Sequence, residues 1–348
     1  MNEFNFDRDF IPTMLKRPHL VILGAGASCA TIIKGDKNGN KLSVMNNFIE
    51  ELGMTDIFAN INLKTRSSNL EDIYSELYER DDCDEIREEL ECRIKDYFGK
   101  LELPDEPTIY DYILLSLRNK DTVVSFNWDN LLIQAYHRVS KITNDLPSLA
   151  FLHGNISMGY CKNDNGFGYI HNKCKNCGDS YYPSQILFPV KKKDYNSDEH
   201  LKLQWNGVLD EIKEAAIITI FGYSAPSSDV EAIQLMLKAF DRFGDKGRIY
   251  DTIEIIDKPG ISQELLYTRW ENFITPTNDH VEILDSFFDS YMARFPRRSI
   301  EGYVKSKFEG CFIDNASNPY QENMNFEELK SLVKPLIDNE NAGNIKVM

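Results

Sequence analysis

The chain has 348 residues, of which 42% are apolar, and a formal net charge of −16. This composition supports a large core and excludes global disorder. Because a strongly acidic surface repels phosphate backbones, we expect no direct binding of nucleic acid. The N-terminal MNEFNFDRDF lacks the basic start and apolar core of a secretory signal. No stretch approaches ~18 uninterrupted apolar residues, so we expect a cytoplasmic protein without a membrane span.

Five short apolar or β-branched runs are typical of buried parallel strands, and each is followed by a polar turn. In chain order these runs are 19–24, 122–126, 149–152, 216–221 and 253–256. Helical patterns lie between them. Strands that alternate with helices predict a doubly wound α/β fold with a Rossmann-like parallel sheet.

The connection between the first two strands is far too long for a single crossover. Ile73, Leu77, Leu90 and Phe98 recur in it at helical spacing among many acidic residues. This pattern predicts an inserted helical module over about 40–118 with an acidic outer face.

Two further regions depart from the strand–helix alternation. The stretch 156–200 is rich in Gly, Asn, Lys, Cys and Tyr and predicts a small loop-rich subdomain. After about residue 276, apolar faces recur at helical spacing and predict a helical C-terminal extension, 276–348, beyond a main domain of 1–275. One face consists of Val281, Leu284, Phe287, Phe288 and Tyr291, and the other of Phe326, Leu329, Leu332 and Val333.

A glycine turn follows the first strand in the sequence HLVILGAGAS. Gly24 and Gly26 permit a sharp turn and close approach of a phosphate, and Ser28 is placed to cap a helix or bond a phosphate oxygen. The dinucleotide fingerprint G-x-G-x-x-G is incomplete because Cys29 occupies the third glycine position. The turn is therefore either a nucleotide-binding turn or an ordinary strand–helix connection, and hydride-transfer chemistry is disfavoured.

Polar residues follow the later strands as well. Asn127 and Asp129 come after the second predicted strand, His153 follows the next, and Gly222 and Ser224 follow the fourth. Ligands of open parallel sheets bind beyond the carboxyl ends of the strands, so these groups are expected to converge with the glycine turn.

Simpler interpretations remain for the same residues. Asn127 or Asp129 can cap a helix, and a single His153 can be a structural hydrogen-bonding group. Ser228 and Glu231 form an S-x-x-E capping box that explains much of SSDVE without a ligand.

The seven cysteines are odd in number and scattered, which fits reduced thiols better than a disulfide framework. Cys174 and Cys177 form a CxxC turn that suits tetrahedral zinc, and Cys161 lies upstream. The fourth ligand is then His171 or Asp164. The alternatives are thiols packed as small apolar groups, or a redox pair.

Taken in order, GAGAS, SFNWDN, LHGN, the cysteine cluster and FGYSAPSSD resemble the motifs of the sirtuin-like fold. The chain is most similar to the bacterial sirtuin-like NADases of anti-phage defence systems, over about residues 19–260. The resemblance implies that NAD+ is the substrate and that zinc is structural.

The resemblance also assigns roles to individual residues. Asn127 would hold the ribose and a water at the scissile bond, Asp129 would organise the nicotinamide side, and His153 would be the general base. The residues implied to contact the pyrophosphate and the adenosine half are Gly24, Ala25, Gly26, Ser28, Gly222, Ser224 and, bordering the adenine ribose, Asp257.

Two departures from the family pattern point away from protein deacylation. Phe126 stands where deacylating sirtuins carry Gln, and after the cysteine cluster SQILFPVKKKDY replaces the acyl-lysine-binding Phe-Gly-Glu segment. We therefore expect an NAD+ hydrolase that releases nicotinamide and ADP-ribose.

Unregulated hydrolysis of NAD+ would harm the host, so we expect a gated activity. The gate is a homo-oligomer or a protein partner, and the resemblance implies a hexameric AAA-type ATPase translocase. The alternatives are a sensor that binds NAD or ADP-ribose without turnover, and an NAD-dependent protein deacylase or ADP-ribosyl transferase.

Overall fold

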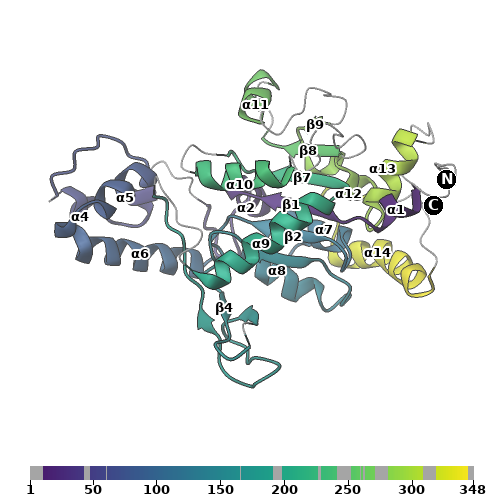
Figure 1. The fold of residues 1–348 in the computed structure, drawn as a ribbon, viewed down its shortest axis with the longest axis horizontal. Helices are drawn as coiled ribbons and strands as arrows, with labels where there is room; N and C mark the ends of the chain where they lie inside the picture. Colours follow the sequence, from purple (N-terminus) through teal and green to yellow (C-terminus); the bar gives the residue numbers. More distant parts are fainter. Residues whose placement is uncertain are drawn as a thin grey trace.

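The computed structural model describes residues 11–42, 48–59, 61–164, 166–190, 198–225, 229–240, 252–258, 260–261, 263–270, 281–308 and 319–343. A six-stranded parallel sheet forms its centre (Figure 1). The strand order is β3-β2-β1-β7-β8-β9. The strands are β1 (His19–Leu23), β2 (Thr122–Ser125), β3 (Ser148–Phe151), β7 (Ile217–Phe221), β8 (Thr252–Ile256) and β9 (Val281–Leu284). The predicted parallel α/β fold and its five strand runs are confirmed.

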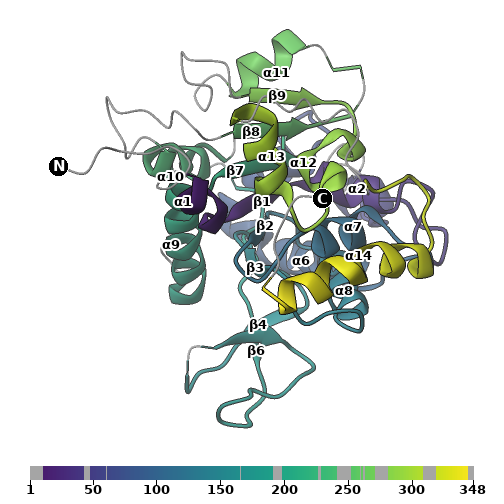
Figure 2. The same ribbon diagram turned by 90° about the vertical axis from the view of Figure 1, so that its right-hand side faces the viewer.

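The strands are apolar on both faces because helices cover both faces. Alternate β1 residues Leu20 and Ile22 belong to one core, whereas Val21 and Leu23 belong to the other. Helices α9 (Glu199–Glu214) and α10 (Val230–Phe240) cover the first face. Helices α2 (Ala25–Thr31), α7 (Ile109–Ser116) and α8 (Leu131–Val139) cover the second. Figure 2 shows these two layers on opposite sides of the strands.

The expected helical module is present between β1 and β2. It contains α3 (Phe48–Glu51), α4 (Thr55–Ala59), α5 (Leu70–Tyr78), the short 3-10 helix η2 (Asp81–Cys83) and α6 (Asp84–Gly99). The predicted apolar stripe is largely buried, because α5 and α6 pack against each other through it. Helix α7 closes the module, and a capping box between Thr108 and Asp111 fixes its start.

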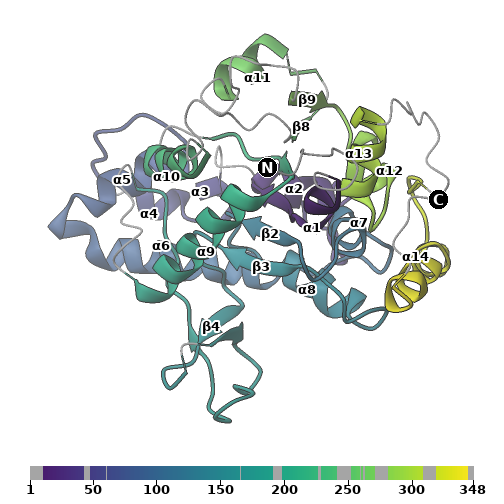
Figure 3. The ribbon, with the colours of Figure 1, turned by 45° about the vertical axis from the view of Figure 1, so that its right-hand side comes forward.

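A small lobe projects from the main body after β3, and Figure 3 shows it beneath the sheet. It is a three-stranded antiparallel sheet in the order β5-β4-β6. Its strands are β4 (Met158–Tyr160), β5 (Phe167–Tyr169) and β6 (Tyr182–Pro183).

The C-terminal region is partly helical and partly a continuation of the sheet. The helix predicted over 281–291 is wrong at its start, because Val281–Leu284 form β9 and pair with β8. A 3-10 helix η6 (Phe287–Asp289) and α12 (Tyr291–Arg294) follow. This segment forms a strand because the backbone of β8 offers an edge for pairing, which helical spacing in the sequence cannot reveal.

The remaining helices are α1 (Ile11–Lys16), α11 (Gln263–Trp270), α13 (Ser299–Phe308) and α14 (Phe326–Asn341).

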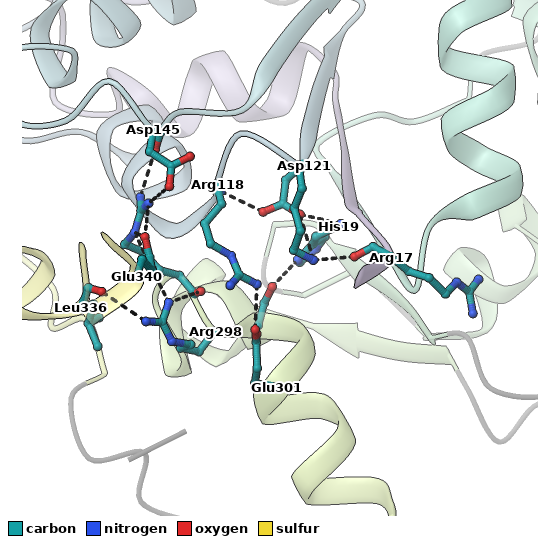
Figure 4. Close-up of polar contacts among 12 residues, drawn as sticks. Arg17, His19, Arg118, Asp121, Asp145, Arg298, Glu301, Leu336 and Glu340 are labelled. Carbon is teal, nitrogen blue, oxygen red and sulfur yellow. Dashed lines mark hydrogen bonds and ion pairs between the residues drawn. The ribbon is translucent and has the colours of Figure 1, made fainter. Parts of the chain in front are cut away.

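The predicted apolar face of α14 is confirmed, since Leu329 and Val333 are buried against the main core. Its last turn is fixed by charge. Glu340 accepts hydrogen bonds from Arg297 Nε at 2.9 Å and from Arg298, and both guanidinium groups are buried. Nearby, Arg118 pairs with Glu301 at 2.8 Å, as Figure 4 shows.

A row of buried, hydrogen-bonded polar side chains crosses β1, β7 and β8. Ser299 Oγ lies 2.8 Å from His19 Nδ1, and His19 Nε2 lies 2.8 Å from Thr219 Oγ1. Thr219 donates to Glu254 Oε2 at 2.6 Å, and the backbone N–H of Tyr291 donates to Glu254 Oε1 at 2.7 Å. This row of hydrogen bonds therefore joins α12 and α13 to the middle of the sheet.

Among the described helices, none is long and apolar enough to cross a bilayer.

Candidate functional site

The strand order reverses between β1 and β7, which makes the carboxyl ends of these strands the topological switch point. Chain connections leave this point in opposite directions, so a crevice for a ligand is expected there. The glycine turn lies at the end of β1, and Gly222 lies at the end of β7. The residues at this edge form the candidate site.

The glycines hold the two strand ends in close contact. A Cβ on Gly24 would lie 2.4 Å from Tyr223 Cα, and a Cβ on Gly26 would lie 2.7 Å from Gly222 Cα. Gly222 has φ +62°, and its own Cβ would lie 2.3 Å from the Ala27 amide nitrogen. Here glycine is required both for the left-handed turn and for the approach of two backbones.

Two amides of the turn are already used by the fold. Gly24 N–H donates to Phe221 O at 3.0 Å, and Gly26 N–H donates to Gly222 O at 2.9 Å. Ala25 and Gly26 are exposed at the first turn of α2, whereas Gly24 is buried. The assignment of this turn to a pyrophosphate stays a prediction.

Asn127 and Ser28 meet directly beneath the glycine turn. Asn127 Nδ2 lies 2.8 Å from Gly24 O, 2.9 Å from Ser28 Oγ and 3.2 Å from the Tyr110 hydroxyl. Ser28 Oγ lies 2.6 Å from Tyr110 and donates to Asp129 Oδ2 at 2.7 Å. A serine hydroxyl has one proton and two lone pairs, so Ser28 is fully used.

This network fixes how the Asn127 amide is turned. Nδ2 points into the buried cluster, and the described part of the chain forms no hydrogen bond to Oδ1. Oδ1 is therefore available to accept a hydrogen bond from a water or a ribose hydroxyl.

Asp129 is a buried carboxylate in a neutral environment. Burial raises its pKa, while hydrogen bonds from Ser28 and from the Leu131 amide oppose that rise. Burial also raises the pKa of the Tyr110 hydroxyl well above its usual range, and the nearby Asp129 charge adds to this effect. A carboxylate surrounded by neutral donors favours a cationic group beside it.

His153 lies two residues after the end of β3 and is also buried. Its ring centroid is 4.8 Å from that of Phe126, the residue before Asn127, and the rings meet edge to face. His153 Nε2 lies 3.6 Å from Asp229 Oδ1, and Tyr223 donates to Asp229 Oδ2 at 2.9 Å. Because β1, β2 and β3 run parallel, the glycine turn, the amide and the imidazole each follow a strand that ends at the same edge of the sheet.

The other predicted ligand-contact residues lie at the same edge. Ser224 is exposed in the turn after β7, and Asp257 is half buried directly after β8. The roles predicted for them remain predictions.

Three polar residues of this site have no predicted role. Asp229 and Tyr223 belong to the polar run after β7, where the S-x-x-E pattern explains SSDVE as a helix start without a ligand. Tyr110 gives no local signal, because it comes from α7, far from every strand end in the sequence.

The small lobe brings the three predicted zinc ligands together. The Sγ atoms of Cys161, Cys174 and Cys177 all lie within 4.8 Å of one another. Cys174 Sγ lies 3.0 Å from Asp164 Oδ2, and this contact is the main cause that holds the pKa of Asp164 below its usual range. His171 is exposed and packs edge-on against Tyr169.

Three thiols supply three of the four ligands of a tetrahedral zinc site, and a carboxylate oxygen is also a donor that zinc accepts. Within the described lobe, the mutually close group contains only the three cysteines and neither His171 nor Asp164. Asp164 contacts Cys174 and His171 is exposed, so Asp164 is the nearer fourth donor.

Comparisons with known proteins give only a general likeness. No protein-family model and no curated protein matches the chain. A Sir2 homologue in complex with NAD is 15% identical, with a TM-score of 0.36, and the match covers 87% of this chain and 95% of that one. A mutant Sir2 homologue with ADP-ribose is 14% identical, with a TM-score of 0.39 and coverage of 85% and 96%.

Proposed function

We propose that this protein hydrolyses NAD+ at the bond between nicotinamide and ribose, giving nicotinamide and ADP-ribose. The observation that carries the proposal is the Asn127–Ser28–Asp129–Tyr110 network at the switch point of the sheet. The order of the sequence motifs supports the same activity.

The reaction needs orientation more than strong acid catalysis. The C1′–N bond breaks with its electron pair moving to the nicotinamide nitrogen, so the leaving group departs neutral. Water then forms the C1′–O bond and loses a proton. A site that holds the ribose and the water in line supplies much of the rate by positioning.

The proposed roles follow from how each group is held. Asn127 Oδ1 accepts a hydrogen bond from the attacking water or a ribose hydroxyl, because Nδ2 is fixed in the buried cluster. The Asp129 charge stabilises the positive charge shared by nicotinamide and ribose before the bond breaks. His153 accepts the proton, directly or through a ribose hydroxyl, and passes it to solvent.

The chain's own zinc ligands have a separate part in the proposal. Cys161, Cys174, Cys177 and Asp164 would hold the metal in the small lobe, where it supplies structural stability. No step of the hydrolysis uses it.

The test is direct incubation of the purified chain with NAD+, with nicotinamide and ADP-ribose followed by chromatography. Asn127→Ala and His153→Ala should each reduce product at least about 100-fold, the scale of a lost acid–base or positioning group. Asn172→Ala, at an exposed asparagine of the small lobe, is the matched control and should leave turnover unchanged. Full turnover in either site variant would refute its assigned role.

The same experiment separates the other candidate functions. Tight NAD+ binding without product under every condition would indicate a sensor. Formation of O-acetyl-ADP-ribose only with an acetylated peptide would indicate a deacylase.

We further propose that the activity is gated and serves anti-phage defence by NAD+ depletion, as the motif resemblance suggests. The gate would be a homo-oligomer or a hexameric AAA-type ATPase partner. Turnover measured across a range of protein concentrations tests the first, since activity per chain should rise with assembly.

A further inference from the structure

The environment of the His153 ring differs on its two sides. Phe126 covers one side edge to face, and an aromatic ring offers no strong hydrogen-bond acceptor. Asp229 presents a carboxylate oxygen 3.6 Å from Nε2, and both side chains are at least 94% buried. A buried carboxylate facing a buried imidazole is an arrangement that burial alone would disfavour.

Asp229 is held by Tyr223, which in turn packs on Phe126. Tyr223 donates to its other oxygen at 2.9 Å. The Tyr223 ring in turn stacks on Phe126, with centroids 4.3 Å apart and planes 5° apart. The Asp229 carboxylate is thus bonded to Tyr223, whose ring stacks on Phe126, and Phe126 packs against the imidazole. Asp229, Tyr223 and Phe126 together therefore hold the His153 ring.

We propose that Asp229 is a positioning residue for His153, fixing the orientation of the imidazole and stabilising its protonated form. The proposal rests on the proposed function for its catalytic consequence, but not for its effect on His153 itself. When His153 accepts a proton from water, the new positive charge lies next to the Asp229 carboxylate. The distance of 3.6 Å is long for a hydrogen bond and should shorten once the ring is charged.

Asp229 directly precedes α10, and Tyr223 lies in the turn after β7 and reaches the ring through Asp229. Phe126, from the end of β2, and Trp205 of α9, which packs on Phe126, contribute no charge. The Asp229 charge is therefore the feature to remove.

The first experiment measures the pH at which the His153 ring titrates, and it does not rely on turnover. The titration of His153 is followed by NMR of the histidine-labelled full chain, with His153→Ala identifying its signal among the six histidines. Asp229→Asn should move the midpoint to lower pH by at least about one unit, because an opposite charge at this distance favours the protonated ring. Asp229→Glu should restore most of the shift.

The control is Asp210→Asn, which removes the same charge from an exposed position on α9 and should leave the midpoint unchanged. An unchanged midpoint in folded Asp229→Asn would overturn the proposal. If Asp229→Asn does not fold, Asp229→Ser makes the same prediction. Loss of the fold in the Asn, Ser and Glu variants alike would also overturn it, because the charge would then not explain the role.

The second experiment measures nicotinamide release against pH. In Asp229→Asn, kcat should fall at least about 10-fold with KM within about 2-fold, and the acidic limb of the profile should move to lower pH. Wild-type protein without turnover would refute the proposed hydrolase while leaving the NMR result valid. A changed KM with an unchanged pH profile would instead indicate a substrate contact and overturn the positioning role.

Discussion

Gly222→Ala is the substitution that tests most directly how the switch point is built. Gly222 has φ +62°, a region that costs a residue with a Cβ about 1–2 kcal/mol. The added Cβ would also lie 2.3 Å from the Ala27 nitrogen and 2.6 Å from Gly26 Cα. Because these contacts are backbone atoms, no side-chain rotation can relieve them.

The expected destabilisation follows from three contributions. The left-handed strain is offset by about 0.4–1 kcal/mol of lost freedom in the unfolded chain, which leaves about 1 kcal/mol. Pushing two backbones apart costs about 1–3 kcal/mol. Stretching the Gly26 N–H to Gly222 O hydrogen bond costs about 1 kcal/mol more. We expect the free energy of unfolding to fall by about 3–5 kcal/mol, together with loss of NAD+ turnover.

Gly39→Ala is the matched control, because Gly39 has φ +84° but no atom within 4 Å of an added Cβ. Gly39→Ala should lower the free energy of unfolding only by the strain of its left-handed backbone, about 1 kcal/mol. Urea unfolding followed by fluorescence gives both values. If Gly222→Ala and Gly39→Ala agree within about 0.5 kcal/mol, the close approach of the two strand ends does not contribute and the argument fails.

Other parts of the structure give further predictions. Glu340→Gln should lower the free energy of unfolding by about 3 kcal/mol, because the buried Arg298 guanidinium loses its carboxylate while Arg297 keeps its ion pair with Asp145; thermal unfolding within 1 °C of wild type would contradict this. Burial raises the pKa of Glu254 to about 7 from 4.5, so this carboxyl favours folding below pH 4.5 and its contribution is lost as pH rises to 7. Glu254→Gln should therefore flatten the dependence of unfolding free energy on pH across that window by about 3 kcal/mol, as measured by urea unfolding at several pH values; an unchanged slope would refute the assignment. Zinc content measured on the purified chain should approach one ion per chain and be lost in Cys174→Ser, and equal metal content in both would exclude the thiol site.

The sequence predicted the sheet well because parallel strands are buried on both faces. Continuous apolar runs such as 216–221 then give a signal that is hard to mistake. The β9 strand was missed because its residues are only half buried, and their spacing equally suits a helix. An edge strand depends on a neighbour to pair with, and that neighbour is not visible in its own sequence.

The candidate site was predicted only in part for a similar reason. Asn127, Ser28 and Gly24 each follow or join a strand, so topology alone brings them to one edge. Tyr110 belongs to a helix of the inserted module, and its distance from Ser28 depends on how α7 packs on α2. The pairing of Asp229 with His153 depends on a turn whose geometry no local pattern specifies.

The pairing of β9 with β8 has a practical consequence for shortened versions of this chain. Removing everything beyond residue 275 would leave β8 with a row of unsatisfied amides and carbonyls, a surface that recruits other chains into aggregates. It would also take away the Tyr291 N–H that Glu254 depends on. The tail is thus part of the folded structure, and functional studies should retain it through the end of α14, which holds Glu340 against Arg297 and Arg298.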